Sequence, residues 1–171
     1  KNKNFKALVT TGPTREYLDP IRYISNESSG KQGYEIALAL KRLGIKTKLI
    51  TGPSNLVFSK DLIIKKIISA KEMLSEVKKS LPVDIAVCAA AVSDFKPINK
   101  SKNKIKKNYT NIDNLSLEKN PDILDYLSKN NKYRPKIVIG FSAETENVIK
   151  NFKIKIKEKY CDLIVANDVS K

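Results

Sequence analysis

The chain contains no histidine and no tryptophan, and only two of its 171 residues are cysteine. Without histidine, a Ser-His or Cys-His catalytic pair and an imidazole-bound zinc site are excluded. Cys88 and Cys161 have neither C-x-x-C spacing nor the number needed for a disulfide framework, so we expect buried thiols in a reducing cytosol. Carboxylates, lysines and main-chain dipoles remain as the chemical repertoire.

Long apolar runs are also missing. No stretch approaches the roughly 20 residues that a membrane-spanning helix needs, and the amino terminus leads into a predicted strand rather than a signal peptide. We therefore predict a cytoplasmic protein without a membrane partner. The length suits a single domain over residues 1–171, large enough to bury a core without disulfides or metals.

Acidic residues are few relative to basic ones: 33 Lys and Arg face 18 Asp and Glu, which gives a net charge of +15. Such an excess favours an anionic partner, either nucleic acid, a membrane surface or a phosphorylated small molecule. The lysines are spread over the whole chain and interleaved with Asn and Ile, so a general compositional bias explains the charge equally well. Charge alone does not choose among these alternatives.

Short apolar runs alternate with helical patterns along the chain. The apolar runs predict strands at 5–10, 46–51, 62–68, 84–91, 136–141 and 162–166, and helical spacing appears over 33–43, 70–81, 121–129 and 147–159. This alternation predicts a Rossmann-like three-layer α/β fold with a mostly parallel sheet. Gly44 is expected to end the first helix, and Asn120 to cap the third ahead of Pro121 and Asp122.

One segment interrupts the alternation. Residues 96–119 are rich in Lys and Asn and follow the fourth predicted strand without a clear helix or strand pattern. A segment of this length is either a functional lid or disorder. We name it the flap.

The first strand leads directly into a polar loop, residues 11–30, with small hydroxyl residues, glycines and two arginines. Open α/β sheets bind their ligands at the carboxyl ends of parallel strands. Ser28, Ser29 and Gly30 precede a helix, so their hydroxyl and main-chain N–H groups favour a phosphate site. The loop contains neither standard glycine-rich nucleotide motif, and a surface loop with an ordinary serine N-cap is the alternative.

Five blocks in the same order resemble the phosphopantothenate-cysteine ligase family, the synthetase domain of bacterial coenzyme A biosynthesis. They are TTGPTREYLDPIRYISNESSGKQGYEIA at 10–37, AAAVSDF at 89–95, KIKK at 104–107, KNPDI at 119–123, and IGFSAET at 139–145 followed by DLIVANDVS at 162–170. The blocks span nearly the whole chain. The family domain continues beyond the last block, so we expect this chain to lack a C-terminal segment.

The resemblance implies a reaction in two steps. The carboxylate of 4'-phosphopantothenate attacks the α-phosphate of CTP, giving an acyl-cytidylate and pyrophosphate, and the amine of L-cysteine then displaces CMP to form the amide. The resemblance further implies Mg²⁺ as cofactor, a homodimer, and a separate or fused flavin-dependent decarboxylase as partner. An ATP-using ligase of the same family and a basic module that binds nucleotides or nucleic acid are the alternatives.

The resemblance also implies which residues form the site. Asn26, Arg22 and Lys104 match catalytic positions: an amide that contacts the acyl-cytidylate, a guanidinium that grips a phosphate or carboxylate, and a lysine on the flap that closes over the nucleotide. Positions for substrate or nucleotide binding are Gly12, Ser28, Ser29, Gly30, Ala89, Ala90, Ala91, Asp94, Lys104, Asn120, Pro121, Asp122, Ile123, Phe141, Lys155 and Lys159. The sequence does not identify the metal ligands.

Overall fold

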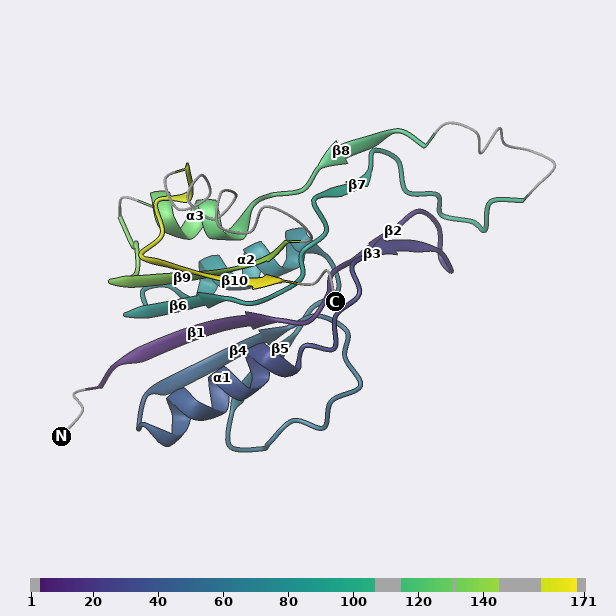
Figure 1. The fold of residues 1–171 in the computed structure, drawn as a ribbon. Helices are drawn as coiled ribbons and strands as arrows, with labels where there is room; N and C mark the ends of the chain where they lie inside the picture. The colour runs from purple at the N-terminus through teal and green to yellow at the C-terminus, as the bar shows by residue number, and fades with distance from the viewer. Residues whose placement is uncertain (1–3, 107–114, 131, 145–157, 169–171) are drawn as a thin grey trace.

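The computed structural model describes residues 4–106, 115–130, 132–144 and 158–168 (Figure 1). Six strands form one parallel sheet in the order β10-β9-β6-β1-β4-β5. Their bounds are Lys6–Thr11 for β1, Lys46–Thr51 for β4, Ile63–Lys66 for β5, Ile85–Cys88 for β6, Ile137–Glu144 for β9 and Leu163–Asp168 for β10. From β1 the chain adds β4 and β5 on one side of the sheet, and it then adds β6, β9 and β10 on the other side. The switch of direction lies between β1 and β6, where such sheets bind ligands.

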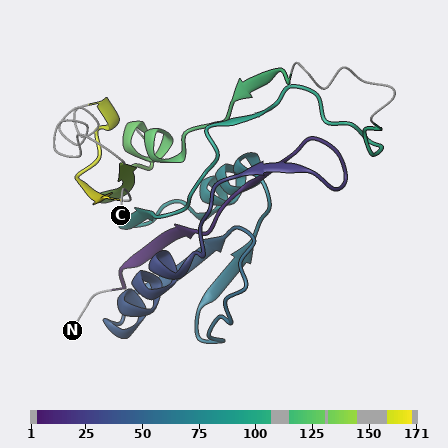
Figure 2. The same cartoon turned by 45° about the vertical axis from the view of Figure 1, so that its right-hand side comes forward.

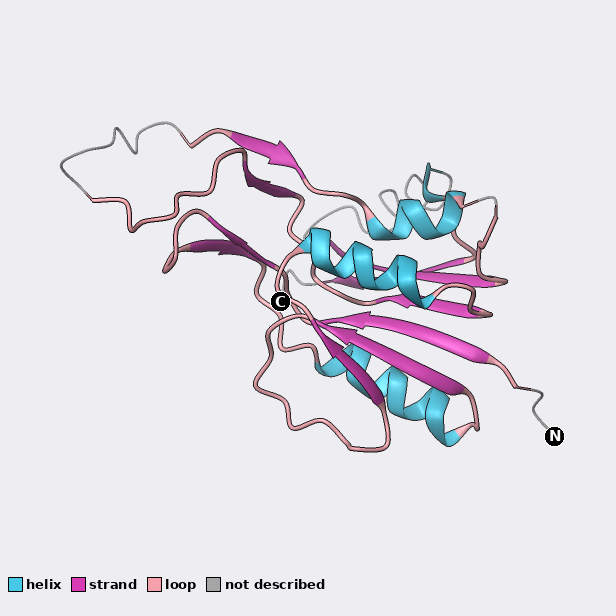
Figure 3. Ribbon diagram, turned by 180° about the vertical axis from the view of Figure 1, so that it is seen from behind, coloured by secondary structure: helices cyan, strands magenta, loops and turns pink. Residues whose placement is uncertain are grey.

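Helices cover both faces of the sheet, which confirms the predicted three-layer α/β fold. Helix α1, Lys31–Arg42, lies on one face, and α2, Ala70–Ser80, lies on the other with α3, Ile123–Lys129 (Figures 1 and 3). Successive residues of β1 point to opposite faces, so Leu8 packs in the core beneath α2 and α3 while Val9 packs against α1. None of the described helices is long and apolar enough to cross a bilayer.

Two short antiparallel ribbons project from the carboxyl edge of the sheet. One pairs β2, Arg15–Tyr17, with β3, Tyr23–Ser25, and the other pairs β7, Phe95–Pro97, with β8, Leu117–Lys119. The two ribbons lie side by side, and we call them, with the described flap residues 98–106 and 115–116, the arm (Figures 1 and 2). The sequence predicted none of these four strands: β2 and β3 lie within the predicted loop 11–30, and β7 and β8 lie at the two ends of the predicted flap. Strands of three residues are too short to show an alternating pattern.

The helix boundaries follow the predicted punctuation in part. Gly44 has a φ of 80° and donates its N–H to the carbonyl of Lys41 at 2.9 Å, so it ends α1 as expected. The predicted cap of α3 was wrong: the side chain of Asp122, not Asn120, accepts the N–H of Asp125, and the helix begins at Ile123. The predicted helix 147–159 lies outside the described residues except for its last two, which are helical.

Candidate ligand-binding site

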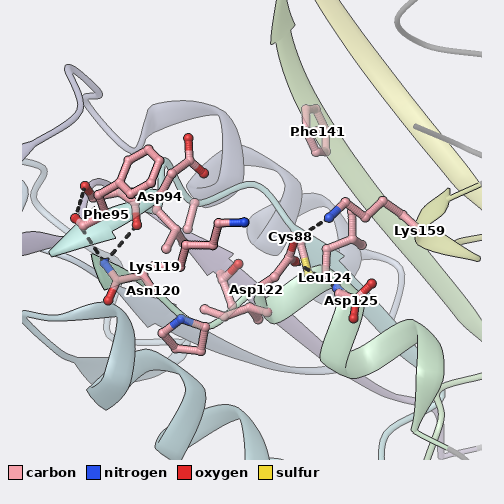
Figure 4. Close-up of a pocket in the computed structure, with 16 residues that line it drawn as sticks. Cys88, Asp94, Phe95, Lys119, Asn120, Asp122, Leu124, Asp125, Phe141 and Lys159 are labelled. Atoms are coloured by element: carbon pink, nitrogen blue, oxygen red, sulfur yellow. Dashed lines mark hydrogen bonds and ion pairs between the residues drawn. The ribbon is translucent and has the colours of Figure 1, made fainter. Parts of the chain in front are cut away.

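Among the cavities that the described residues line, two flank the β1–β6 strand pair at the carboxyl edge of the sheet. The α3 cavity, of about 700 Å³, lies where β6 and β9 end against the start of α3, and the α1 cavity, of about 520 Å³, lies beside the start of α1. The α3 cavity is lined by Thr10, Cys88, Ala90, Val92, Ser93, Asp94, Phe95, Lys119, Asn120, Pro121, Asp122, Ile123, Leu124, Asp125, Phe141 and Lys159 (Figure 4). The α1 cavity is lined by Pro13, Arg15, Tyr23, Ser25, Asn26, Glu27, Ser28, Ser29, Pro53, Ser54, Asn55 and Leu56.

The α3 cavity forms where β9 no longer pairs with β6, although the chain that follows β6 is still paired with the first strand and its loop. The β6–β9 register ends at Cys88 and Gly140. Beyond that point Ala89 and Ala91 continue to donate their N–H groups to carbonyls of the first strand and its loop, at 3.1 and 3.0 Å. Ala90 lies between them, so its N–H and C=O point the other way, into the space left by β9, and meet no partner among the described residues. One donor and one acceptor are therefore presented side by side at the cavity.

Asp122 and Lys159 form an ion pair across the α3 cavity (Figure 4). Oδ1 of Asp122 accepts the N–H of Asp125 at 2.9 Å, and Oδ2 accepts from Nζ of Lys159 at 2.5 Å. Burial opposes ionisation of Asp122, but these two donors outweigh it and hold its pKa below the ordinary value. The same carboxylate raises the pKa of Lys159. Both groups are charged at neutral pH. Their ion pair joins the start of α3 to the segment that precedes β10.

Asn120 supports the loop that carries Asp94. Its main-chain N–H donates to the carbonyl of Asp94 at 2.8 Å, and its side-chain Nδ2 donates to the carbonyls of Ser93 and Phe95, at 2.9 and 3.4 Å. The carboxylate of Asp94 is exposed and has no partner among the described residues. Asn120 thus fixes the main chain, and Asp94 offers its exposed side-chain oxygens to a ligand.

The described side chains do not form a metal site with enough protein ligands to hold an ion by themselves. The described part of the chain holds no group of three or more His, Cys, Asp or Glu side chains placed to bind an ion. Magnesium is commonly held by one or two carboxylates together with substrate phosphates. Asp94 beside a nucleotide-sized cavity fits an ion that arrives on phosphates.

Both thiols are free, and neither is suited to nucleophilic attack. Cys161 is buried, as predicted, and Cys88 is half-buried at the α3 cavity. Burial raises the pKa of both thiols, to about 12 for Cys88. A thiol with so high a pKa is almost entirely protonated at neutral pH.

The α1 cavity adjoins a helix start that favours an anion. Gly30, not a serine, is the N-cap residue, with a φ of 77° and no side chain of its own to cap the helix, so the alternative of an ordinary serine N-cap was wrong. The first turn contains no acidic residue. Ser28 and Ser29 accept the N–H groups of Gly30 and Lys31 at 3.3 Å, and the carbonyl of Ser29 accepts from Oγ of Ser54 at 2.8 Å. The positive end of the helix dipole and several hydroxyl groups therefore surround the cavity.

The loops after β1 and β4 pack against each other behind the α1 cavity. A Cβ at Gly52 would lie 1.7 Å from the carbonyl oxygen of Pro13, so only glycine fits. Gly12 and Gly30 also meet at this junction, and Oγ1 of Thr11 donates to the carbonyl of Gly30 at 2.7 Å. This close packing fixes the predicted Gly12 and Gly30 behind the cavity rather than on its surface.

Asn26 lies at the boundary between the cavities. It lines the α1 cavity, and its Nδ2 donates at 3.0 Å to the carbonyl of Val92, which lines the α3 cavity. A second bond joins the N–H of Ser93, which also lines the α3 cavity, to Oγ1 of the buried Thr14 at 3.0 Å. A ligand that occupied both cavities would pass Asn26.

Arg22 and Lys104 line neither cavity. Both lie on the arm, where Nε of Arg22 donates to Oδ2 of Asp19 at 2.8 Å and its Nη2 donates to the carbonyl of Ile105 at 2.7 Å. Within one chain the structure does not bring these two predicted catalytic cations to the cavities. Lys155 lies outside the described residues.

Both cavities are also lined by residues that the sequence did not predict. Residues 53–56 line the α1 cavity, and Lys119 and Asp125 line the α3 cavity. The first of these segments follows the carboxyl end of β4, so the strand-end rule applied to β1 would also have found it. Of the predicted set, Ala89 and Ala91 do not line the cavity but hold Ala90 in place.

A family model described as the DNA/pantothenate metabolism flavoprotein C-terminal domain matches residues 2–171. Proteins described as coenzyme A biosynthesis bifunctional protein CoaBC are similar to the chain: that of Borreliella burgdorferi is 44% identical over 169 residues, covering 98% of this chain and 43% of the relative. That of Escherichia coli K12 is 42% identical over 171 residues, covering 98% and 42%. The chain thus spans about two fifths of the length of these curated relatives.

Solved structures agree with this similarity. The crystal structure of the C-terminal domain of a CoaBC protein superposes with a TM-score of 0.83 at 36% identity, covering 97% of this chain and 78% of that one. A mutant of Cab2 in complex with phosphopantothenate-cysteine superposes with a TM-score of 0.80 at 18% identity, covering 98% and 73%. At that identity the second likeness concerns the fold.

Proposed function

Because the chain belongs to the family of C-terminal domains of DNA/pantothenate metabolism flavoproteins, we propose that it joins 4'-phosphopantothenate to L-cysteine in coenzyme A biosynthesis, with CTP as the activating nucleotide. The names of the relatives support the pathway, and the Cab2 complex supports the ligand class on this fold. The five sequence blocks support CTP and the acyl-cytidylate intermediate. One observation carries the proposal: two cavities of ligand size meet at Asn26.

The nucleoside of CTP occupies the α3 cavity in this proposal. The N–H of Ala90 donates to N3 of cytosine and its C=O accepts from the 4-amino group, a pairing that the open main chain allows. Asp94 accepts from the ribose hydroxyls, and Phe141 borders the base. Magnesium, carried on the phosphates, offsets their negative charge when bound.

The anionic groups extend from the α3 cavity toward the start of α1. There the helix dipole, Ser28 and Ser29 favour phosphate oxygens. Asn26 lies where the two ligands come together, so its side-chain amide is placed to donate to an oxygen on which charge develops. Stabilisation by N–H groups and cations, without a nucleophilic side chain, suits a chain whose thiols are protonated.

Both steps balance without a further reactant. In the first, the carboxylate oxygen bonds to the α-phosphorus of CTP as the bond to pyrophosphate breaks. In the second, the cysteine amine bonds to the acyl carbon, the bond to CMP breaks, and the amine gives up one proton. The protein contributes by holding the reacting groups in register.

We further propose that the site is completed across a homodimer. Arg22 and Lys104 lie on the arm, away from the cavities of their own chain. The arm also exposes large apolar side chains, with Ile98 at 52%, Leu115 at 48% and Leu117 at 42% exposed. A second copy that covered these side chains would receive both cations at its own cavities. The family resemblance supports a decarboxylase partner that takes the product, and the greater length and bifunctional names of the relatives support a second activity beside this domain.

A reconstituted reaction tests the proposal. The full-length protein is incubated with CTP, 4'-phosphopantothenate, cysteine and Mg²⁺, and we expect CMP, pyrophosphate and the amide in equal amounts. Without cysteine, pyrophosphate release should stop after about one equivalent per site, with the acyl-cytidylate held on the protein. A folded sample that binds CTP but forms no CMP would contradict the proposed activity.

A further inference from the structure

Asp19 is a fully buried carboxylate with no part in the reaction described so far. It lies at the tip of the β2–β3 ribbon, and its exposed fraction is 0%. A buried charge is costly unless each of its oxygens is paired. The groups that donate hydrogen bonds to Asp19 therefore indicate which part of the structure the buried carboxylate stabilises.

The two oxygens of Asp19 have different partners. Oδ1 accepts the N–H groups of Ile21 and Arg22, each at 2.9 Å, and so closes the turn of its own ribbon. Oδ2 accepts Nε of Arg22 at 2.8 Å and the N–H of Ile105 at 3.1 Å, and it also pairs with Nη2 of Arg22. These donors hold the pKa of Asp19 well below the ordinary value, the guanidinium of Arg22 contributing most.

The contact with Ile105 is not needed for the turn. Ile105 is 86 residues further along the chain and adjoins Lys104 on the flap. The guanidinium of Arg22 also bonds to the carbonyl of Ile105, so both main-chain groups of that residue are held by the Asp19–Arg22 pair. A further bond, from the N–H of Ser101 to the carbonyl of Leu18 at 2.8 Å, aligns the flap along the ribbon tip.

We propose that Asp19 is a positioning residue for the ligation reaction, which presents Arg22 and Lys104 together by holding the Ile105 peptide and the Arg22 guanidinium on one carboxylate oxygen. This inference rests on the proposed function, because it takes both cations as contacts of the anionic reactants. Nη1 of Arg22 donates to no described residue, so one edge of the guanidinium remains for a ligand. Neutralising Asp19 would leave each cation free to move, and misplacement by about 1 Å costs on the order of 100-fold in rate.

Asp19→Asn in the full-length protein tests the inference. The amide cannot serve both sides: an NH₂ group in place of Oδ2 faces the donors Ile105 N–H and Arg22, and the flipped amide breaks the turn. We expect kcat to fall about 10- to 100-fold while KM for CTP changes less than about threefold. Asp84→Asn is the matched control, since Asp84 also accepts a distant main-chain N–H and a lysine, at the opposite edge of the sheet.

A double-mutant cycle separates positioning from simple destabilisation. If Asp19 acts through Lys104, then Asp19→Asn combined with Lys104→Gln should lose less rate than the product of the two single losses. Amide exchange over residues 98–106 should also be faster in Asp19→Asn than in wild type. Ile105→Pro, which removes the flap N–H donor and leaves Asp19 in place, should lower kcat in the same direction and serves if Asp19→Asn fails to fold.

Each outcome bears on one proposal. Wild-type turnover alone decides the proposed function, whatever the variants do. In an active wild type, an unchanged kcat of Asp19→Asn or fully multiplicative losses in the cycle would overturn the positioning role. Unchanged exchange over 98–106 would overturn it even if the wild type were inactive, because the carboxylate would then not be holding the flap.

Discussion

The α3 cavity and the arm obtain their polar groups in different ways. In the α3 cavity one donor and one acceptor are main-chain groups of Ala90 at a strand end, fixed by the pairing of Ala89 and Ala91 beside a six-stranded sheet. On the arm they are the long side chains of Arg22 and Lys104, carried by ribbons of three-residue strands and aligned by one carboxylate. The sheet therefore fixes the positions of main-chain groups that can recognise a ligand. The positions of the charged side chains on the arm depend instead on the carboxylate of Asp19 and on what the arm packs against.

The largest effect is expected at Asn26, which lies outside the arm, in the remainder of the described chain that we call the body. Asn26→Asp should lower overall turnover about 100- to 1000-fold, because a donor becomes a carboxylate that repels the acyl-cytidylate. The second step should suffer most, so the intermediate accumulates and can be detected by mass spectrometry. Asn4→Asp adds the same charge at the exposed amino edge and should leave turnover within about twofold.

Lys104→Gln tests the arm. We expect turnover to fall at least about tenfold with the melting temperature unchanged, because the side chain acts on the reactants rather than on folding. A 1:1 mixture of Asn26→Asp and Lys104→Gln, allowed to exchange subunits, should recover roughly a quarter of wild-type activity if Lys104 serves the partner's cavity. Turnover no higher than the average of the two variants alone would place Lys104 at the cavity of its own chain.

Nucleotide selection should reflect the main chain of the body. The C=O and N–H of Ala90 match a ring that offers an amino donor beside a nitrogen acceptor, which cytosine and adenine share and uracil reverses. We expect UTP to be used about 10- to 100-fold less efficiently than CTP, and ATP to be disfavoured through ring size alone. Competition of the three triphosphates in one assay measures both ratios. Equal use of UTP and CTP would contradict a role of the Ala90 main chain in recognising the base.

A smaller effect is expected on stability. Two glycine substitutions should show that a steric clash inside the body costs more than an unfavourable backbone conformation at its surface. Gly52→Ala places a methyl group against the carbonyl of Pro13, at a cost of about 2–3 kcal/mol and a Tm lower by roughly 4–12 °C. At Gly44 a Cβ would meet nothing within 4 Å, so Gly44→Ala should cost only the left-handed backbone, about 1 kcal/mol. Thermal melts of both variants check the ordering, and similar losses would contradict it.

The body could be predicted from sequence because its signals are local and repeated. The apolar runs located all six sheet strands, and the resemblance to the ligase family pointed to Ala90 and Asp94, which line the α3 cavity. The arm could not be predicted in the same way. Its strands are three residues long, and the role of Asp19 depends on a contact with Ile105 that only the folded chain creates. The cap of α3 was misjudged because Asn120 and Asp122 are both good capping residues, and local sequence did not show which of them the loop needed.

The persistence of β1–β6 pairing beyond the ends of both strands affects the kinetics. Because Ala91 remains bonded to the loop after β1, the paired chain runs between the two cavities, and no described residue lines both of them. Neither cosubstrate then has to pass the other on its way in. A steady-state analysis of such an enzyme should show random-order addition of nucleotide and acid, followed by the amine.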